Sequence, residues 1–145
     1  LAALARFTTF RVSGRQELIT RRISQVLGED VHHVDTTVTE WTTSHGDLHW
    51  GNVTGPDLVI LDWADWGLAP RGNDAACLWA TALGVPEIAE RVLAEFHDDL
   101  HTRSGRIARL WVTCNILRIA RRRADAHPLT EPARKAAGQL LTDLA

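Results

Sequence analysis

Methionine is absent from the 145 residues, so the sequence as written is expected to be a processed, excised or partial product. No apolar run approaches the roughly 18 residues that a membrane span needs. The N-terminus also lacks the basic-then-apolar order of a secretion signal. These absences argue against a membrane protein and favour a soluble chain in the cytoplasm.

Cysteine and lysine are both scarce. Cys77 and Cys114 lie far apart in apolar helical patterns and form no Cys-x-x-Cys pair. This argues against a disulfide framework or a zinc cluster and favours reduced thiols in the core. Lys135 is the sole lysine, and arginine supplies the rest of the basic charge. Because 16 basic residues nearly balance 18 acidic ones, the net charge gives no attraction to nucleic acid or to an anionic membrane.

Helical patterns dominate what is present. A chain of this length usually forms one domain and buries about two thirds of its extended surface, and no repeat or linker divides residues 1–145. Gly28 would end the first helix, and Thr130 would cap the last. Apolar periodicity predicts helices over residues 13–27, 73–82, 86–100 and 106–124, and from 130 onward. We therefore expect a mostly helical α+β fold.

The middle of the chain predicts short strands and loops. Residues 29–40 have the composition of a polar connection, and residues 40–43 that of a short strand. A hairpin-like pair is expected at 52–53 and 58–61, because Gly55-Pro56-Asp57 supplies turn residues between them. After Gly67 the pattern changes entirely to helix.

The segment from Ser44 to Trp66 carries three oxygen-bearing side chains in an order suited to phosphoryl transfer. Asp47 and Asn52 lie on a loop with glycines, and an apolar strand brings Asp62 into the next turn. Phosphoryl transfer needs a carboxylate that orients the acceptor hydroxyl, and Mg²⁺, which prefers oxygen ligands, across the phosphate oxygens. We interpret Asp47 as the base, Asn52 and Asp62 as metal ligands, and His45 as a structural support. Any one of them alone would be an ordinary turn residue.

These residues resemble the aminoglycoside phosphotransferase and choline kinase superfamily, whose fold is similar to that of protein kinases. HGDLHWGN matches the pattern HGDxxxxN of that family, and LDWADWG matches its apolar strand ending in a metal-binding Asp. The family has another Asp that braces the catalytic loop, and Asp74 in RGNDAACLW matches it. The resemblance covers residues 41–79. It implies a kinase-like C-terminal lobe, with a small β-hairpin catalytic region on a helical bundle, that uses Mg²⁺ and ATP or another nucleoside triphosphate.

Two parts of a complete enzyme of that family are missing. No glycines form GxGxxG or GxxxxGK[ST], and Lys135 lies far from the motif. Only 44 residues precede His45, too few for a five-stranded nucleotide lobe. We therefore expect the C-terminal lobe of a phosphotransferase, inefficient alone, which an N-terminal lobe in a longer native protein would complete. A non-catalytic kinase-like module for binding or regulation is the alternative.

The acceptor is defined only as a small hydroxylated molecule. Acids over residues 87–99 could face a polyamine or an aminoglycoside, but a solvated helix face is favoured. Trp50, Trp63 and Trp66 could hold a quaternary ammonium, but packing of the sheet against the helices is favoured. The expected partners are thus a nucleotide and this acceptor, without nucleic acid or membrane.

Two further patterns are given ordinary interpretations. His97 and His101 are one helical turn apart, like the histidines of HExxH, but the glutamate is replaced and a third ligand is not evident. The arginines between residues 106 and 123 could form a phosphate or nucleic-acid patch. They point in different directions, which favours a solvated, salt-bridged face.

Overall fold

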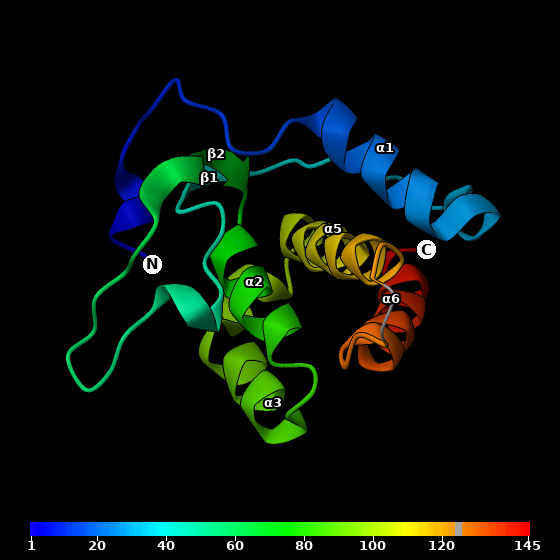
Figure 1. Ribbon diagram of the computed structural model, residues 1–145. Coiled ribbons are helices and arrows are strands. Elements are labelled where there is room, and N and C mark those ends of the chain that lie inside the picture. The colour runs from blue at the N-terminus through cyan, green and yellow to red at the C-terminus, as the bar shows by residue number, and fades with distance from the viewer. Residues whose placement is uncertain (124–125) are drawn as a thin grey trace.

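The chain folds mainly into helices, with one small sheet, as Figure 1 shows for the computed structural model. The structure describes residues 1–123 and 126–145. The regular elements are α1 (Gln16–Leu27), β1 (Trp41–Ser44), β2 (Gly67–Pro70), α2 (Asn73–Thr81), α3 (Pro86–Glu95), α4 (His97–Leu100), α5 (Arg103–Ala120) and α6 (Thr130–Leu144). Short 3-10 turns are η1 (Leu4–Arg6), η2 (Gly28–Val31), η3 (Trp50–Asn52) and η4 (Trp63–Asp65). The expected mostly helical α+β class is confirmed.

Helix α1 forms because apolar residues recur on one of its faces. Ile19, Ile23 and Val26 are buried and pack against α5. Gly28 follows the helix with a φ of +63°, a conformation that glycine adopts without strain. The predicted helix and its glycine end are confirmed, although the helix begins at Gln16, three residues later than expected.

The segment before β1 is a connection, as predicted, but its apolar residues belong to the core, which the prediction missed. Residues 34–38 have no regular secondary structure, and Val34, Thr36 and Val38 are buried while Asp35 and Thr37 are exposed. The Gln16 side chain holds this segment, since it donates to the Thr36 carbonyl at 2.9 Å and accepts from the Val38 amide at 2.8 Å. The signal of burial was the alternation of these three residues with exposed polar ones, and not the average polarity of the segment.

The sheet joins β1 to a strand that the sequence did not indicate. β1 and β2 pair antiparallel, with Trp41 opposite Pro70 and Ser44 opposite Gly67. The prediction of helix alone after Gly67 is therefore wrong for residues 67–70. The hairpin expected over 52–61 is present as a single bridge between Val53 and Ile60.

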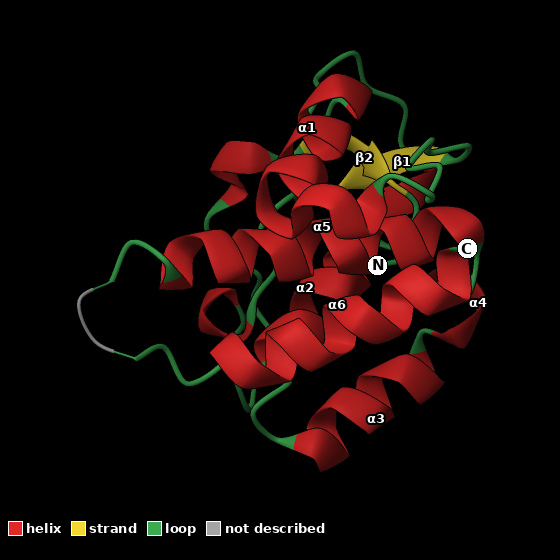
Figure 2. Cartoon of the chain, turned by 90° about the vertical axis from the view of Figure 1, so that its right-hand side faces the viewer, coloured by secondary structure: helices red, strands yellow, loops and turns green. Residues whose placement is uncertain are grey.

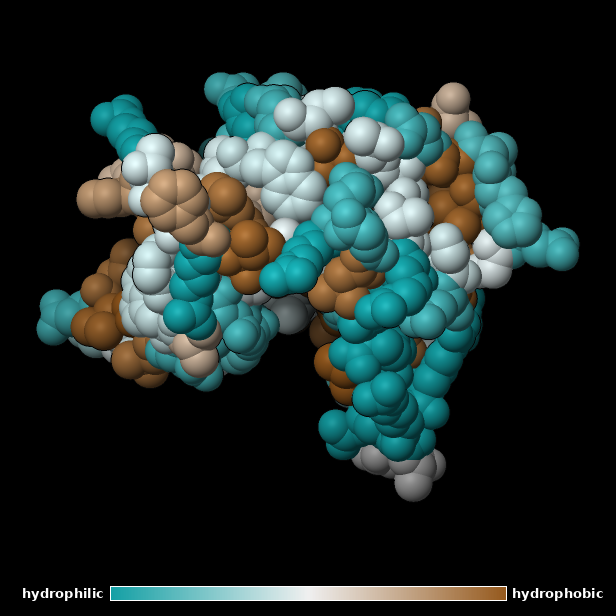
Figure 3. Space-filling view, turned by 90° about the horizontal axis from the view of Figure 1, so that it is seen from above, coloured by the Kyte–Doolittle hydropathy of each residue, from teal (hydrophilic) through white to brown (hydrophobic). Residues whose placement is uncertain are grey.

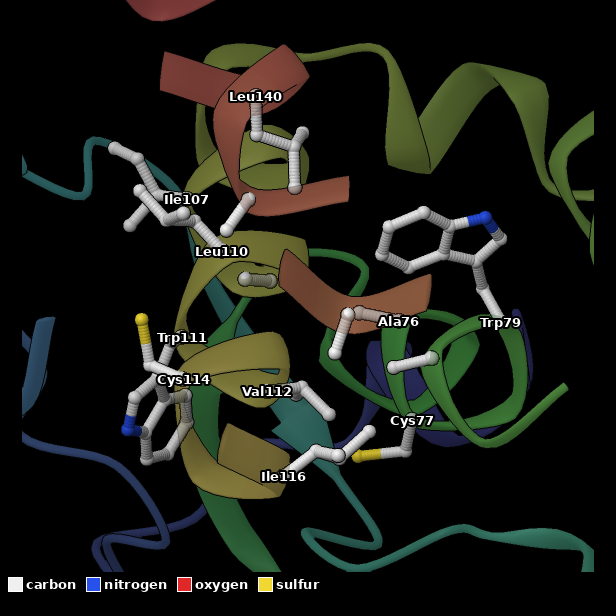
Figure 4. Packing of buried hydrophobic residues seen from close by; sticks show 14 of the residues in the cluster. Ala76, Cys77, Trp79, Ile107, Leu110, Trp111, Val112, Cys114, Ile116 and Leu140 are labelled. Atoms are coloured by element: carbon white, nitrogen blue, oxygen red, sulfur yellow. The ribbon is translucent and has the colours of Figure 1, made fainter. Parts of the chain in front are cut away.

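The helices form a bundle in which α5 lies centrally (Figure 2). α1, α2 and α6 all pack against α5, and α3 packs against α2. Figure 4 shows Cys77 beside Ile116 at the interface of α2 and α5. Cys77 and Cys114 are buried free thiols, as predicted. No helix in the described part of the chain is long and apolar enough to cross a membrane.

Three helix boundaries differ from the predictions. The helix expected over 86–100 breaks at Phe96, which separates α3 from α4. α5 spans 103–120 rather than 106–124, and residue 124 lies outside the described residues. Thr130 does not cap α6 from outside. It is the first helical residue, and its hydroxyl donates to the His127 carbonyl at 2.8 Å.

Candidate active site

The loop after β1 makes a sharp turn at Gly46. Its φ of +92° is one that side-chain-bearing residues rarely adopt. A Cβ at this position would lie 2.2 Å from the Asp65 carbonyl oxygen and 2.4 Å from Ser13 Oγ. Only glycine fits this close approach, and the turn places Asp47 at the rim of the loop.

Asp74 holds the same turn from the first turn of α2. The side chain is 6% exposed and accepts three hydrogen bonds. The donors are the Ser44 hydroxyl, the His45 amide at 2.8 Å and the Gly46 amide at 3.0 Å. Because a helix N-terminus favours negative charge, this carboxylate suits its position in α2. These contacts fix the backbone immediately before Asp47.

His45 joins the loop to the segment that carries Asp62. Its ring is fully buried, and its Nε2 lies 2.8 Å from the Leu61 carbonyl oxygen. The Asp47 amide donates to Nδ1 at 3.3 Å, so the ring proton sits on Nε2 and is donated to Leu61. Trp63 packs edge-on against the ring, with centroids 4.7 Å apart. Both ring nitrogens are occupied within the protein.

Asn52 is positioned by the loop backbone. It is buried, and its side-chain nitrogen donates to the Asp47 carbonyl at 2.8 Å. Its own carbonyl accepts from the Leu61 amide at 2.8 Å, next to Asp62. Since the amide nitrogen is engaged, the side-chain oxygen is the atom that can bind a cation. The backbone thus brings Asp47, Asn52 and the Leu61–Asp62 segment together.

Asp62 combines strained backbone with an available carboxylate. Its φ of 57° and ψ of 68° lie in the left-handed region, and among the described residues it is the one non-glycine residue with positive φ. Such conformations are uncommon and concentrate at functional positions. The side chain is exposed and makes no hydrogen bond or ion pair with another described residue. A carboxylate in this state is free to bind a ligand.

A small pocket of about 190 Å³ opens beside Asp47. α2 contributes Cys77 and Thr81, and α5 contributes Trp111, Asn115 and Ile119. The α5 wall was missed from the sequence, because nothing local to the motif indicates which residues more than 60 positions later face it.

Two neighbours of Asp47 define the chemistry around it. His49 was also missed, and its Nε2 lies 3.8 Å from a carboxylate oxygen of Asp47, whose side chain is 54% exposed. Burial, aided by the charges of Asp74 and Asp47, raises the pKa of the Cys77 thiol. Cys77 therefore stays protonated and does not offer a thiolate nucleophile.

The expected metal ligands are the exposed carboxylate of Asp62 and the buried side-chain amide of Asn52. No group of three or more His, Cys, Asp or Glu side chains in the described part of the chain could hold a metal ion. Mg²⁺ needs fewer protein ligands than such a cluster, because it is bound by one or two carboxylates together with phosphate oxygens and water. The unpartnered Asp62 carboxylate and the Asn52 amide oxygen are chemically suited to that share.

Apolar side chains are exposed around Asp62. Leu58 is 73% exposed, Val59 51%, Leu61 45% and Trp63 43%. Figure 3 shows apolar surface on the left of the view, the side on which Figure 1 places the loop of residues 53–61. The Trp50 and Trp63 indoles donate to the Leu78 and Ile60 carbonyls, so both rings are tied to the protein while about half exposed.

The remaining sequence patterns lie away from this site. The rings of His97 and His101 stack 4.2 Å apart at the surface. Glu87 and Glu90 are exposed on α3 and do not line the Asp47 pocket. Arg109 is only 6% exposed, so the prediction of a solvated arginine face on α5 is wrong for this residue. Because other elements pack against α5 on several sides, the side chain of Arg109 does not point toward solvent.

The model of the phosphotransferase enzyme family matches residues 7–111, more than half of the chain and the whole segment from β1 through α2. No curated protein and no solved structure matches the chain.

Proposed function

Because this chain belongs to the phosphotransferase enzyme family, we propose that it provides the catalytic C-terminal lobe of a small-molecule kinase. The reaction would transfer the terminal phosphoryl group of ATP, or another nucleoside triphosphate, to a hydroxyl of a small acceptor. The observation that carries this proposal is Asp62, a strained and unpartnered carboxylate on a segment hydrogen-bonded to Asn52 and His45.

Asp47 would orient the acceptor hydroxyl. Its carboxylate is half exposed and borders the pocket, while Asp74 and His45 fix the backbone around it. As the acceptor oxygen attacks the terminal phosphorus, its proton would pass to Asp47. The bond from phosphorus to the bridging oxygen would break and leave the nucleoside diphosphate.

Asn52 and Asp62 would hold divalent metal through one oxygen each. Mg²⁺, when bound there, would neutralise charge on the phosphate oxygens. The Asp62 carboxylate makes no hydrogen bond with another described residue, so metal binding would not have to break one. Its left-handed backbone is held by the Leu61 contacts to His45 and Asn52.

The acceptor pocket supports a small hydroxylated substrate. Its volume of about 190 Å³ is below that of the drug-sized sites of about 300–1,000 Å³. Trp111, Ile116 and Ile119 make one wall apolar, and Asn115 and Thr81 provide hydrogen-bonding groups. The acidic face of α3 plays no part in this pocket.

A non-catalytic binding or regulatory module is the second candidate. One observation favours it: Lys135, the sole lysine of the chain, lies on α6 in a groove that shares no residue with the Asp47 pocket. This chain therefore offers no lysine of its own near the Asp47 pocket to hold nucleotide phosphates. Under either candidate, we expect the isolated chain to turn over ATP poorly.

The test measures the affinity of the chain for Mn²⁺–ATP, which reports metal and nucleotide together, by water-proton relaxation and calorimetry. Asp62→Asn removes the charge but keeps the shape, and we expect it to weaken binding by about tenfold or more, the loss of one charged ligand. Asp65→Asn is the matched control, since Asp65 is an exposed acid in the following turn, η4.

The outcomes separate the candidates. Loss of affinity in Asp62→Asn alone supports the metal role. Equal loss in both variants would indicate only a general effect of negative charge, and equal binding in all three proteins would remove Asp62 from the site. Metal-dependent binding with no phosphoryl transfer, even when a nucleotide-binding lobe is present, would favour the non-catalytic module.

A further inference from the structure

A groove of about 840 Å³ lies between α3 and α6, away from the Asp47 pocket. It exists because α3 packs on α2 while α6 packs on α5, which leaves the faces of α3 and α6 apart. Figure 2 shows these two helices beside each other on one side of the bundle. Apolar side chains line it, including Leu83 from the turn after α2, Leu93 from α3, and Ala136 and Leu140 from α6.

The floor of the groove contains a buried cation. Arg109 of α5 lines it, is only 6% exposed, and lies with its guanidinium carbon 5.2 Å from the centre of the Trp79 ring. Figure 4 shows Trp79 reaching from α2 in the direction of α6, whose Leu140 is also labelled. The aromatic face offers partial compensation for the charge. The Trp79 ring does not, however, accept the hydrogen bonds that the guanidinium N–H groups donate within their own plane.

Arg109 has no acceptor in the described part of the chain. It makes no hydrogen bond or ion pair there, and its Nε is buried without a partner. Burial lowers the pKa of Arg109, the negative charge of Asp143 at the rim acts in the opposite direction, and the positive charge of Arg106 adds to the lowering. A buried charge without a partner is unfavourable, and an anion placed in the groove would remove that penalty.

The charges at the rim restrict which anion fits. Glu131 is paired with Arg134. Of the exposed charges that remain at the rim, Lys135 offsets only one of the two acids, Glu90 and Asp143, so one excess negative charge is left to repel a second charge on the ligand. One buried cation and an acidic rim suit one negative charge rather than a polyphosphate. The apolar walls suit a hydrocarbon body.

We propose that this groove binds a small amphipathic monocarboxylate. Its carboxylate accepts the guanidinium hydrogen bonds of Arg109, and its apolar body lies along Trp79 and the leucines of α3 and α6. The groove is separate from the Asp47 pocket, with which it shares no lining residue, so the proposal does not rest on phosphoryl transfer.

The first test compares two probes of equal chain length, octanoate and 1-octanol, on the 145-residue chain by calorimetry. Octanoate should bind about ten to a hundred times more tightly, the gain expected from charge-assisted hydrogen bonds. Arg109→Met retains an apolar stem of similar length. It should reduce octanoate to the affinity of octanol and leave octanol unchanged.

A second pair of variants blocks the groove without altering Arg109. A Cβ at Gly138 of α6 meets no atom within 4 Å, so a side chain there enters open space. Gly138→Phe should fill the groove and abolish octanoate binding, whereas Gly138→Ala, the matched control, should preserve it. Both should keep the fold, because replacing a helical glycine favours the helix.

A charge preference that disappears in Arg109→Met, together with loss of octanoate binding in Gly138→Phe but not in Gly138→Ala, supports the proposal. The proposal is wrong if octanoate fails to bind, if it binds no better than octanol, or if Gly138→Phe binds it normally. Should Arg109→Met fail to fold, the Gly138 pair and the two probes still decide.

Discussion

Replacing Asp74 by alanine should destabilise the whole chain, although Asp74 lies at the edge of the candidate site. The carboxylate accepts from Ser44, His45 and Gly46, and the first two of these residues are almost fully buried. Alanine would leave three donors without an acceptor, two of them on almost fully buried residues. Asp74→Asn keeps the shape of the side chain. It replaces one accepting oxygen by an NH2 group, which cannot accept a hydrogen bond from these donors.

The magnitude follows from the number of donors. Each buried donor left unsatisfied costs about 1–3 kcal/mol. Because the three donors share one carboxylate, their contributions do not simply add, and we expect a total loss of about 3–5 kcal/mol for Asp74→Ala. This is a large part of the roughly 5–15 kcal/mol that holds a typical domain together. It should lower the melting temperature by about 10 °C.

Urea unfolding followed by tryptophan fluorescence measures the loss, and amide hydrogen exchange localises it. The His45 and Gly46 amides should exchange faster in Asp74→Asn. Asp98→Ala is the control: its side chain is 98% exposed, so the change should be within about 0.5 kcal/mol. If Asp74→Ala and Asp74→Asn are both as stable as the unmodified chain, the hydrogen bonds to Asp74 do not hold the loop.

Two other predictions concern the base and the thiols. In a complete enzyme, Asp47→Asn should slow phosphoryl transfer by about 10²–10⁴ with little change in nucleotide binding; an unchanged rate would exclude Asp47 as the base. Burial raises the pKa of Cys77 and raises that of Cys114 from 9.0 to about 12. The unfolded chain then loses these protons first, so stability should be intact below pH 9 and fall as pH rises toward 12. Replacing both cysteines by alanine should flatten this decline in urea titrations, and an unaltered slope would contradict it.

Local patterns were enough to predict most of the helices. Ile19, Ile23 and Val26 repeat at helical spacing and are buried on α1, and the helix predicted to begin at Asn73 does begin there. That Asp47 and Asn52 lie near each other was also predictable, because both are on one continuous loop. In these cases neighbours in the sequence determine the structure.

Features that depend on distant partners could not be predicted. β2 contains glycine and proline and has no alternating pattern, and it forms a strand because it pairs with β1. Arg109 belongs to a helix rich in arginine, and its burial depends on α2 and α6 packing around α5. The α5 wall of the acceptor pocket has the same origin. Long-range packing, rather than local preference, places these residues.

The two halves of the candidate site differ in how firmly they are held. Asp47 follows a turn that a buried carboxylate fixes through three hydrogen bonds, so its position is set by the core. Asp62 belongs to an exposed segment with strained backbone, and few contacts join this segment to His45 and Asn52. The apolar side chains exposed beside Asp62 would lose water if another lobe covered them. Such a cover would stabilise the conformation of Asp62 far more than that of Asp47. We therefore expect it to increase the affinity for metal more than it improves the positioning of the acceptor.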